Sequence, residues 1–154
     1  MKLKLGFIFM LMIFTVGCST EPNAMHTYDK AQVKENLQAV DFEYELPEQV
    51  PFEVKSMETD TLVPDQPIFS VYFTGTEGEQ MMLEVVNATL NTAGSNLFEE
   101  VKIGDRKGFF YENAQGARML LWEKDDVHYQ LKTIAGKAEA LEDSQLITTA
   151  KTFK

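Results

Sequence analysis

The stretch from Phe98 to Ala135 constrains the fold of this chain more than any other. It reads FEEVKIGDRKGFFYENAQGARMLLWEKDDVHYQLKTIA, a series of apolar runs separated by short turn sequences. Asp125-Asp126 is typical of a tight two-residue hairpin turn. After this turn, apolar and polar residues alternate as in a strand with one buried face: Val127, Tyr129 and Leu131 against His128, Gln130 and Lys132. The stretch therefore predicts an antiparallel β-meander.

The first seventeen residues have the pattern of a secretory signal peptide. Lys2 and Lys4 give a positive start, and Leu5 to Val16 form an apolar run too short to span a bilayer comfortably. A small residue then precedes Cys18, the only cysteine of the chain, and this junction resembles the lipobox of bacterial lipoproteins. The resemblance implies cleavage before Cys18 and acylation of its thiol, with Thr15 departing from the usual Leu or Val. The alternative is an ordinary signal peptide followed by a free cysteine, which would leave an unpaired thiol on an exported chain.

Charge narrows the choice of partners. The chain has 24 acidic and 14 basic residues, a formal net charge of −10, and loss of the signal peptide would remove two of the lysines. Nucleic acid and anionic lipid would be repelled by such a surface, so we expect no nucleic-acid partner. Contact with the membrane would depend on the lipid anchor of Cys18. With a single cysteine the chain cannot form an internal disulfide, and the fold must depend on its core.

The remaining pattern predicts a helix, a series of strands and a second helix. Apolar residues recur at helical spacing over 28–40 and 141–153, and Glu142 and Asp143 suit a helix N-terminus. Strands are predicted at 52–57, 68–74, 80–89, 101–104, 107–112, 117–124 and 127–135. We predict an α+β fold: an antiparallel meander of six to seven strands with an N-terminal and a C-terminal helix packed on it. Residues 18–27 would be the lipidated cysteine and a polar tether, and residues 28–154 a single extracytoplasmic domain.

Several short segments are similar to one known family. They are Phe42-Glu43-Tyr44-Glu45-Leu46-Pro47 with Val50-Pro51, Val101-Lys102-Ile103-Gly104, Leu120-Leu121-Trp122-Glu123, His128-Tyr129-Gln130-Leu131, and Leu146-Ile147 with Ala150. Together they resemble the domain-of-unknown-function family 4367, over about residues 30 to 154. This family occurs in Gram-positive surface lipoproteins and has no established catalytic residues. The resemblance therefore assigns no catalytic residue that could be transferred to this chain.

Few residues of the chain suit catalysis. It has two histidines and one cysteine, which is too few for a zinc site of His and Cys ligands, so we expect no metal and no cofactor. His128 is interpreted as a surface or a cross-strand residue. Carboxylates gather at 41–45 and 58–60, where a solvated surface explains them most simply. Two of them facing each other across a cleft would instead suit a glycosidase.

The aromatic residues offer the best hint of a binding site. Phe109, Phe110 and Tyr111 are consecutive, so they cannot all face one side of a strand. Either both faces of the sheet are covered, one by each helix, which we favour, or one face exposes an apolar patch that binds a ligand. Together with Trp122, these three residues are the candidate ligand-facing aromatics.

These observations lead to one expectation and two alternatives. We expect a lipid-anchored, non-enzymatic domain on the outer face of the cell membrane, which binds a protein partner or a small apolar ligand and has a role in envelope sensing. A carboxylate-dependent envelope hydrolase and a structural accessory subunit of a surface complex stay open as alternatives.

Overall fold

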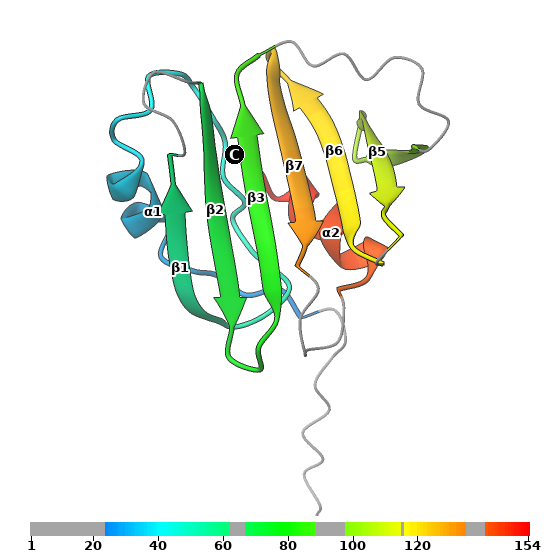
Figure 1. Ribbon diagram of the computed structural model, residues 1–154, viewed down its shortest axis with the longest axis horizontal. Coiled ribbons are helices and arrows are strands. Elements are labelled where there is room, and N and C mark those ends of the chain that lie inside the picture. The colour runs from blue at the N-terminus through cyan, green and yellow to red at the C-terminus, as the bar shows by residue number, and fades with distance from the viewer. Residues whose placement is uncertain (1–23, 62–66, 89–97, 115, 135–140) are drawn as a thin grey trace, which may run out of the picture.

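The computed structural model describes residues 24–61, 67–88, 98–114, 116–134 and 141–154. Its strands are β1 (Val54–Asp60), β2 (Ile68–Gly75), β3 (Gln80–Val86), β4 (Glu99–Ile103), β5 (Arg106–Glu112), β6 (Arg118–Lys124) and β7 (Val127–Thr133), and its helices are α1 (Lys30–Asn36) and α2 (Asp143–Lys151) (Figure 1). The predicted signal peptide and Cys18 lie outside the described residues, as does most of the tether.

All seven strands form one antiparallel sheet in the order β1-β2-β3-β7-β6-β5-β4. The meander predicted from Phe98 onward is confirmed, because β4, β5, β6 and β7 are neighbours in sequence and in space. The expectation of a single meander is wrong. Between β3 and β4 the chain passes to the far edge of the sheet, so that β7 pairs with β3, with Leu83 opposite Leu131.

The composition of the strands gives a physical reason for this order. On their covered side, β3 and β7 present fully buried residues such as Leu83 and Leu131, and a central position buries such strands most completely. The edge strand β4 carries the exposed charges of Glu99, Glu100 and Lys102, which suit a sheet edge.

Two tight turns fix the register of the second half of the sheet. Asp125 and Asp126 have φ values of 52° and 63°, the left-handed conformation of a type I′ turn, as predicted for this hairpin. The turn between β4 and β5 lies at Gly104-Asp105, one residue before the predicted Asp105-Arg106. Gly104 has φ 62°, which is typical of the first central position of a type II′ turn.

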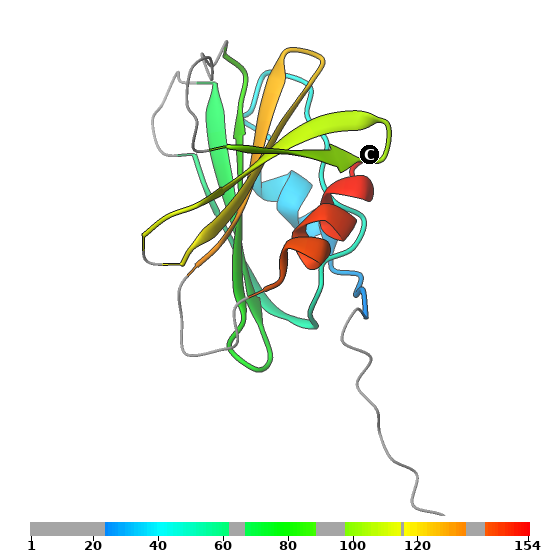
Figure 2. The same ribbon diagram turned by 90° about the vertical axis from the view of Figure 1, so that its right-hand side faces the viewer.

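Both helices lie on the same face of the sheet, here called the core face (Figure 2). The favoured expectation, one helix on each face, is therefore wrong. The helices span only 7 and 9 residues, which is too short to cover a seven-stranded sheet alone. The irregular segment between α1 and β1 completes the layer by burying Leu46, Val50 and Phe52.

Local contacts explain where the helices begin and how the ends of the domain meet. The Asp29 side chain accepts a hydrogen bond from the backbone N–H of Gln32, and Glu142 and Gln145 form a capping box at α2. After α2, Phe153 pairs with Pro47 of the irregular segment in an isolated antiparallel β-bridge. No helix in the described part of the chain is long and apolar enough to cross a membrane.

Candidate functional site

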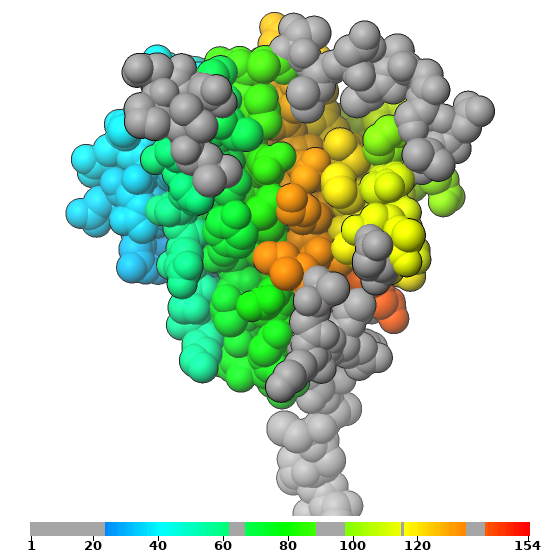
Figure 3. Space-filling view, in the orientation of Figure 1, coloured from blue at the N-terminus to red at the C-terminus, as the bar shows by residue number. Residues whose placement is uncertain are grey.

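The second face of the sheet, here called the open face, carries no helix among the described residues (Figures 2 and 3). Strand alternation places two kinds of side chain on it. Half-buried apolar and aromatic side chains form one kind: Ile68, Tyr72, Val86, Phe109, Tyr111, Met119 and Leu121. Polar and charged side chains lie among them: Glu84, Glu123, His128, Gln130 and Lys132. The open face is therefore neither purely apolar nor purely polar.

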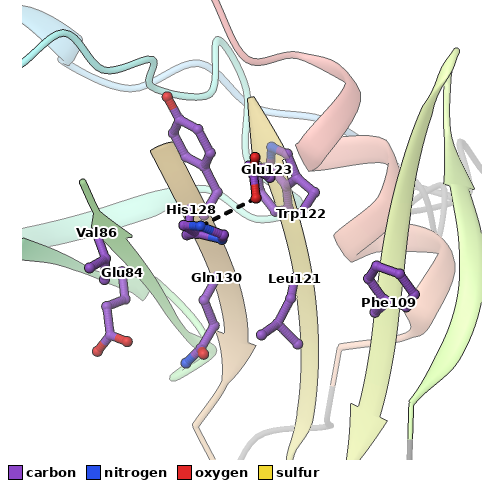
Figure 4. A pocket seen from close by; sticks show the side chains of 9 residues that line it. Glu84, Val86, Phe109, Leu121, Trp122, Glu123, His128 and Gln130 are labelled. Atoms are coloured by element: carbon purple, nitrogen blue, oxygen red, sulfur yellow. Dashed lines mark ion pairs between the residues drawn. The ribbon is translucent and has the colours of Figure 1, made fainter. Parts of the chain in front are cut away.

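A hollow of about 80 Å³ lies on the open face, over strands β3, β7, β6 and β5 (Figure 4). Val86 of β3, Leu121 of β6 and Phe109 of β5 supply its apolar side chains. Glu84 and the polar residues of β6 and β7 supply the rest: Glu123, His128 and Gln130. Trp122 and Tyr129 also line it, from strands whose alternation directs their rings to the core face. Apolar and polar side chains thus lie side by side across the hollow, with His128 and Gln130 of β7 between Val86 of β3 and Leu121 of β6.

A contact between a histidine and a carboxylate joins two strands within this hollow. Glu123 of β6 lies directly opposite His128 of β7, and the carboxylate Oε2 is 3.3 Å from His128 Nε2 (Figure 4). Only 12% of the His128 side chain is exposed, against 55% for Glu123. The prediction of a cross-strand position for His128 is confirmed. A protonated imidazole would make the contact a charge-assisted hydrogen bond, which is stronger than the neutral one.

The four candidate aromatics are divided between the two faces. Phe109 and Tyr111 are half-buried on the open face, and Phe109 lines the hollow. Phe110 and Trp122 face the core, with 8% and 3% of their surface exposed. Trp122 stacks on Tyr129 with a centroid distance of 5.3 Å and an interplanar angle of 7°. The structure therefore brings only Phe109 and Tyr111 to a surface where a partner can reach them.

A second hollow, of about 250 Å³, lies at one end of the sheet. It is lined by Glu43, Tyr44 and Glu45 of the irregular segment, Asn87 after β3, and Lys124, Asp125, Val127 and Tyr129 around the β6–β7 hairpin. Most of these are polar side chains, so it differs in character from the hollow on the open face. We call it the polar hollow.

A local network organises the polar hollow. Lys124 Nζ forms an ion pair and hydrogen bond with Glu45 Oε1, and the backbone N–H of Glu45 donates to the Tyr129 hydroxyl at 3.1 Å. Burial raises the pKa of Tyr129, and the nearby Glu45 carboxylate raises it further, while the hydrogen bond from Glu45 opposes the shift. The other carboxylate oxygen of Glu45 is buried and has no hydrogen-bond partner within the described residues. The network binds the irregular segment to the hairpin.

The side chains that line the two hollows limit the chemistry that is possible there. Among the described residues, no group of three or more His, Cys, Asp or Glu side chains is placed to hold a metal ion. Sequence reasoning missed most of the lining residues, although the alternation of β7 already placed His128 and Gln130 on one face. Glu84 and Leu121 could have been added only if the order of the strands were known.

No family model, curated protein or solved structure matches the chain. The resemblance to the domain-of-unknown-function family 4367 therefore stays a prediction.

Proposed function

We propose that this protein is a lipid-anchored α+β domain on the outer face of the cell membrane, and that it binds a protein partner through the open face. In this proposal it is a non-enzymatic domain with a role in envelope sensing, akin to family 4367. The observation that carries the proposal is the hollow lined by Val86, Phe109 and Leu121 together with Glu84 and Glu123, on a sheet face that carries no helix among the described residues.

The size of the hollow favours a protein partner over a small apolar ligand. Pockets for small molecules usually measure roughly 300–1,000 Å³ and enclose most of the ligand. A hollow of about 80 Å³ has room for one apolar side chain. Protein interfaces often have this form, in which one anchoring side chain fills a pocket and polar contacts surround it. The carboxylates of Glu84 and Glu123 in its lining favour a partner with basic residues next to that side chain.

Site-specific photo-crosslinking in the producing cell tests this proposal. A crosslinker at Leu121 lies in the hollow, whereas one at Lys34 lies on the exposed side of α1 and serves as the matched control. We expect one discrete adduct from position 121 that position 34 does not give, and we expect Phe109→Glu to abolish it. Identical adducts at both positions, or none at 121, would contradict a partner site on the open face.

The anchor is tested separately. The positive start, apolar run and Cys18 support lipidation, which would make the membrane contact independent of the acidic surface. Metabolic labelling with a fatty acid should mark the parent chain and not Cys18→Ser, and mass spectrometry should find the mature chain beginning at Cys18. Equal labelling of both chains, or a mature chain that begins elsewhere, would refute this part of the proposal.

The polar hollow supports a second candidate function, a carboxylate-dependent envelope hydrolase. Its volume of about 250 Å³ approaches that of a small-molecule site, and Glu43, Glu45 and Asp125 line it. Glu45 is held by Lys124, so it would be the fixed carboxylate, and the exposed Glu43 or Asp125 would be the second. Hydrolysis of purified cell-wall material that is lost in Glu45→Gln and kept in Glu58→Gln, a surface control on β1, would favour this candidate.

A further inference from the structure

The free edge of β4 has a pattern that complements itself. Among the described strands, β4 pairs only with β5, so that one of its sides lies at the margin of the sheet (Figure 2). Unpaired strand edges offer backbone groups to any strand that can align with them. Which strand can do so depends on the direction of these groups and on the side chains beside them.

The hairpin geometry determines which backbone groups point outward. Ile103 and Arg106 flank the two-residue turn, and residues in this position exchange hydrogen bonds across the hairpin. The pattern alternates along an antiparallel ladder, so Val101 also bonds to β5, while the N–H and C=O groups of Glu100 and Lys102 point away from it. These two residues therefore present the outward hydrogen-bonding groups of the edge.

The same two residues carry opposite charges, and both are exposed. Within the sheet, Lys102 lies directly opposite Lys107, and like charges in this position destabilise a sheet. The Lys107 ammonium is 3.1 Å from the carboxylate of Glu100, whereas Lys102 has no ion pair in the described part of the chain. A neighbouring strand that placed a carboxylate opposite Lys102 would give this lysine an ion-pair partner and offset its repulsion from Lys107.

We propose that β4 pairs antiparallel with β4 of a second copy of this chain, about a two-fold axis through Val101. In this register, Glu100 of each copy lies opposite Lys102 of the other, and the outward backbone groups of these residues face one another. The two Val101 residues lie opposite each other at the axis. The contact is isologous and closes after two copies, joining two seven-stranded sheets into one.

The other edge of the sheet lacks this complementarity. Antiparallel pairing of two β1 strands about Met57 would place Ser56 opposite Glu58 and Lys55 opposite Thr59. No pair of opposite charges forms, and the register shift between Val54 and Ser56 interrupts the regular edge. The β1 edge is therefore the matched control for the β4 edge.

The expected association is weak and sensitive to salt. A five-residue edge covers much less than the roughly 800 Å² per partner of a standard interface, and its ion pairs are exposed to solvent. The pairing itself does not depend on the proposed function. If the chain is lipid-anchored, however, confinement to the membrane raises the local concentration and favours the pair.

Disulfide trapping tests the register in the full chain on its own membranes. Residues opposite each other in a non-hydrogen-bonded antiparallel pair have Cα atoms about 4.5 Å apart, within the range of a disulfide. Val101→Cys should form a covalent dimer on mild oxidation. Met57→Cys, at the centre of β1, should stay at the background of the parent chain, whose only cysteine is Cys18. A Val101→Cys dimer no more abundant than the Met57→Cys dimer would overturn the proposal.

Charge variants in the Val101→Cys chain then test why the copies pair. Lys102→Glu would place the new carboxylate of each copy opposite Glu100 of the other copy. Because these like charges repel, we expect about a tenfold lower dimer fraction. Glu100→Lys should act similarly, and the double exchange Glu100→Lys with Lys102→Glu should restore the dimer. An unchanged dimer in the single variants, or no recovery in the double variant, would overturn the register. Near-ultraviolet circular dichroism of Trp122, which lies in the core, verifies that each variant is folded.

Discussion

Replacing Phe153 by Ala tests whether the end of the described chain belongs to the core. The Phe153 side chain is 5% exposed, and its ring meets Trp122 edge-on at 4.9 Å and Tyr129 at 5.6 Å. Truncation of a buried phenylalanine to alanine usually costs about 3–5 kcal/mol, through lost burial and the remaining cavity. The two edge-to-face contacts are part of this loss. We therefore expect Phe153→Ala to lower the free energy of unfolding by about 3–4 kcal/mol, a large share of the stability of a typical domain.

Urea unfolding measures this change with two probes. Trp122 is the only tryptophan of the chain and touches Phe153, so its fluorescence reports the local environment, while far-ultraviolet circular dichroism reports the whole sheet. Both transitions should shift together to lower urea. Phe153→Leu, which keeps apolar volume but loses the ring contacts, should cost about 1 kcal/mol. Exposed Lys151→Ala should change stability by less than about 0.5 kcal/mol. A fluorescence shift without a shift in dichroism would show that the C-terminal segment docks independently, and would refute the reasoning.

Three further predictions concern packing, a turn and an ion pair. A Cβ at Gly108 would lie 2.6 Å from Ile103 Cδ1 and 3.1 Å from Ile103 Cγ1, so Gly108→Ala should cost about 1 kcal/mol. Ile103→Val removes Cδ1 but keeps Cγ1, so the cost should be smaller in that background, and additive costs in a double-mutant cycle would contradict this clash. Asp126 has φ 63°, and Asp126→Gly should raise the free energy of unfolding by about 0.5 kcal/mol in thermal or urea unfolding; a loss would contradict the type I′ assignment. Lys30, whose Nζ is 2.5 Å from Glu48 Oε1, lowers the pKa of Glu48. The ion pair therefore stabilises the folded state fully above the unfolded pKa of this carboxyl. This contribution is lost as the pH falls through the folded pKa. The stability difference between the parent chain and Glu48→Gln should therefore shrink in acid, and a difference independent of pH would refute the pairing.

Much of the local structure follows from the sequence because each hairpin is encoded locally. Alternation identified the side of β7 that carries His128, and the Asp125-Asp126 turn fixed its pairing with β6. Alternation also separated Phe109 from Phe110, although it could not say which of them faces the core. That choice depends on β5 and β6, where Gly108 lies opposite Trp122 on the core face.

The order of the strands could not be predicted in the same way. Periodicity reports which side of a strand is buried, but it does not report which strand lies next to it. The pairing of β3 with β7 depends on contacts such as Leu83 with Leu131, far apart in sequence. The irregular segment was missed as core for a related reason, because Leu46 and Val50 lie outside every predicted helix and strand, and Phe52 was predicted to begin a strand. To predict the hollow on the open face, one would need both the side of each strand that is buried and the order of the strands.

The central position of β7 sets a limit on the order in which the chain can fold. β7 is the last of the seven strands to be synthesised, yet it is the only link between β3 and β6 in the sheet. Before it arrives, β1–β3 and β4–β6 can form only as separate ladders with open inner edges. The bridge between Pro47 and Phe153 closes over an even longer span of sequence. Such contacts slow folding, because a long loop must close before they stabilise the chain. A chain delivered from its N-terminus would therefore complete its core only after nearly all of it had emerged, and until then the inner edges of β3 and β6 would be exposed to other chains.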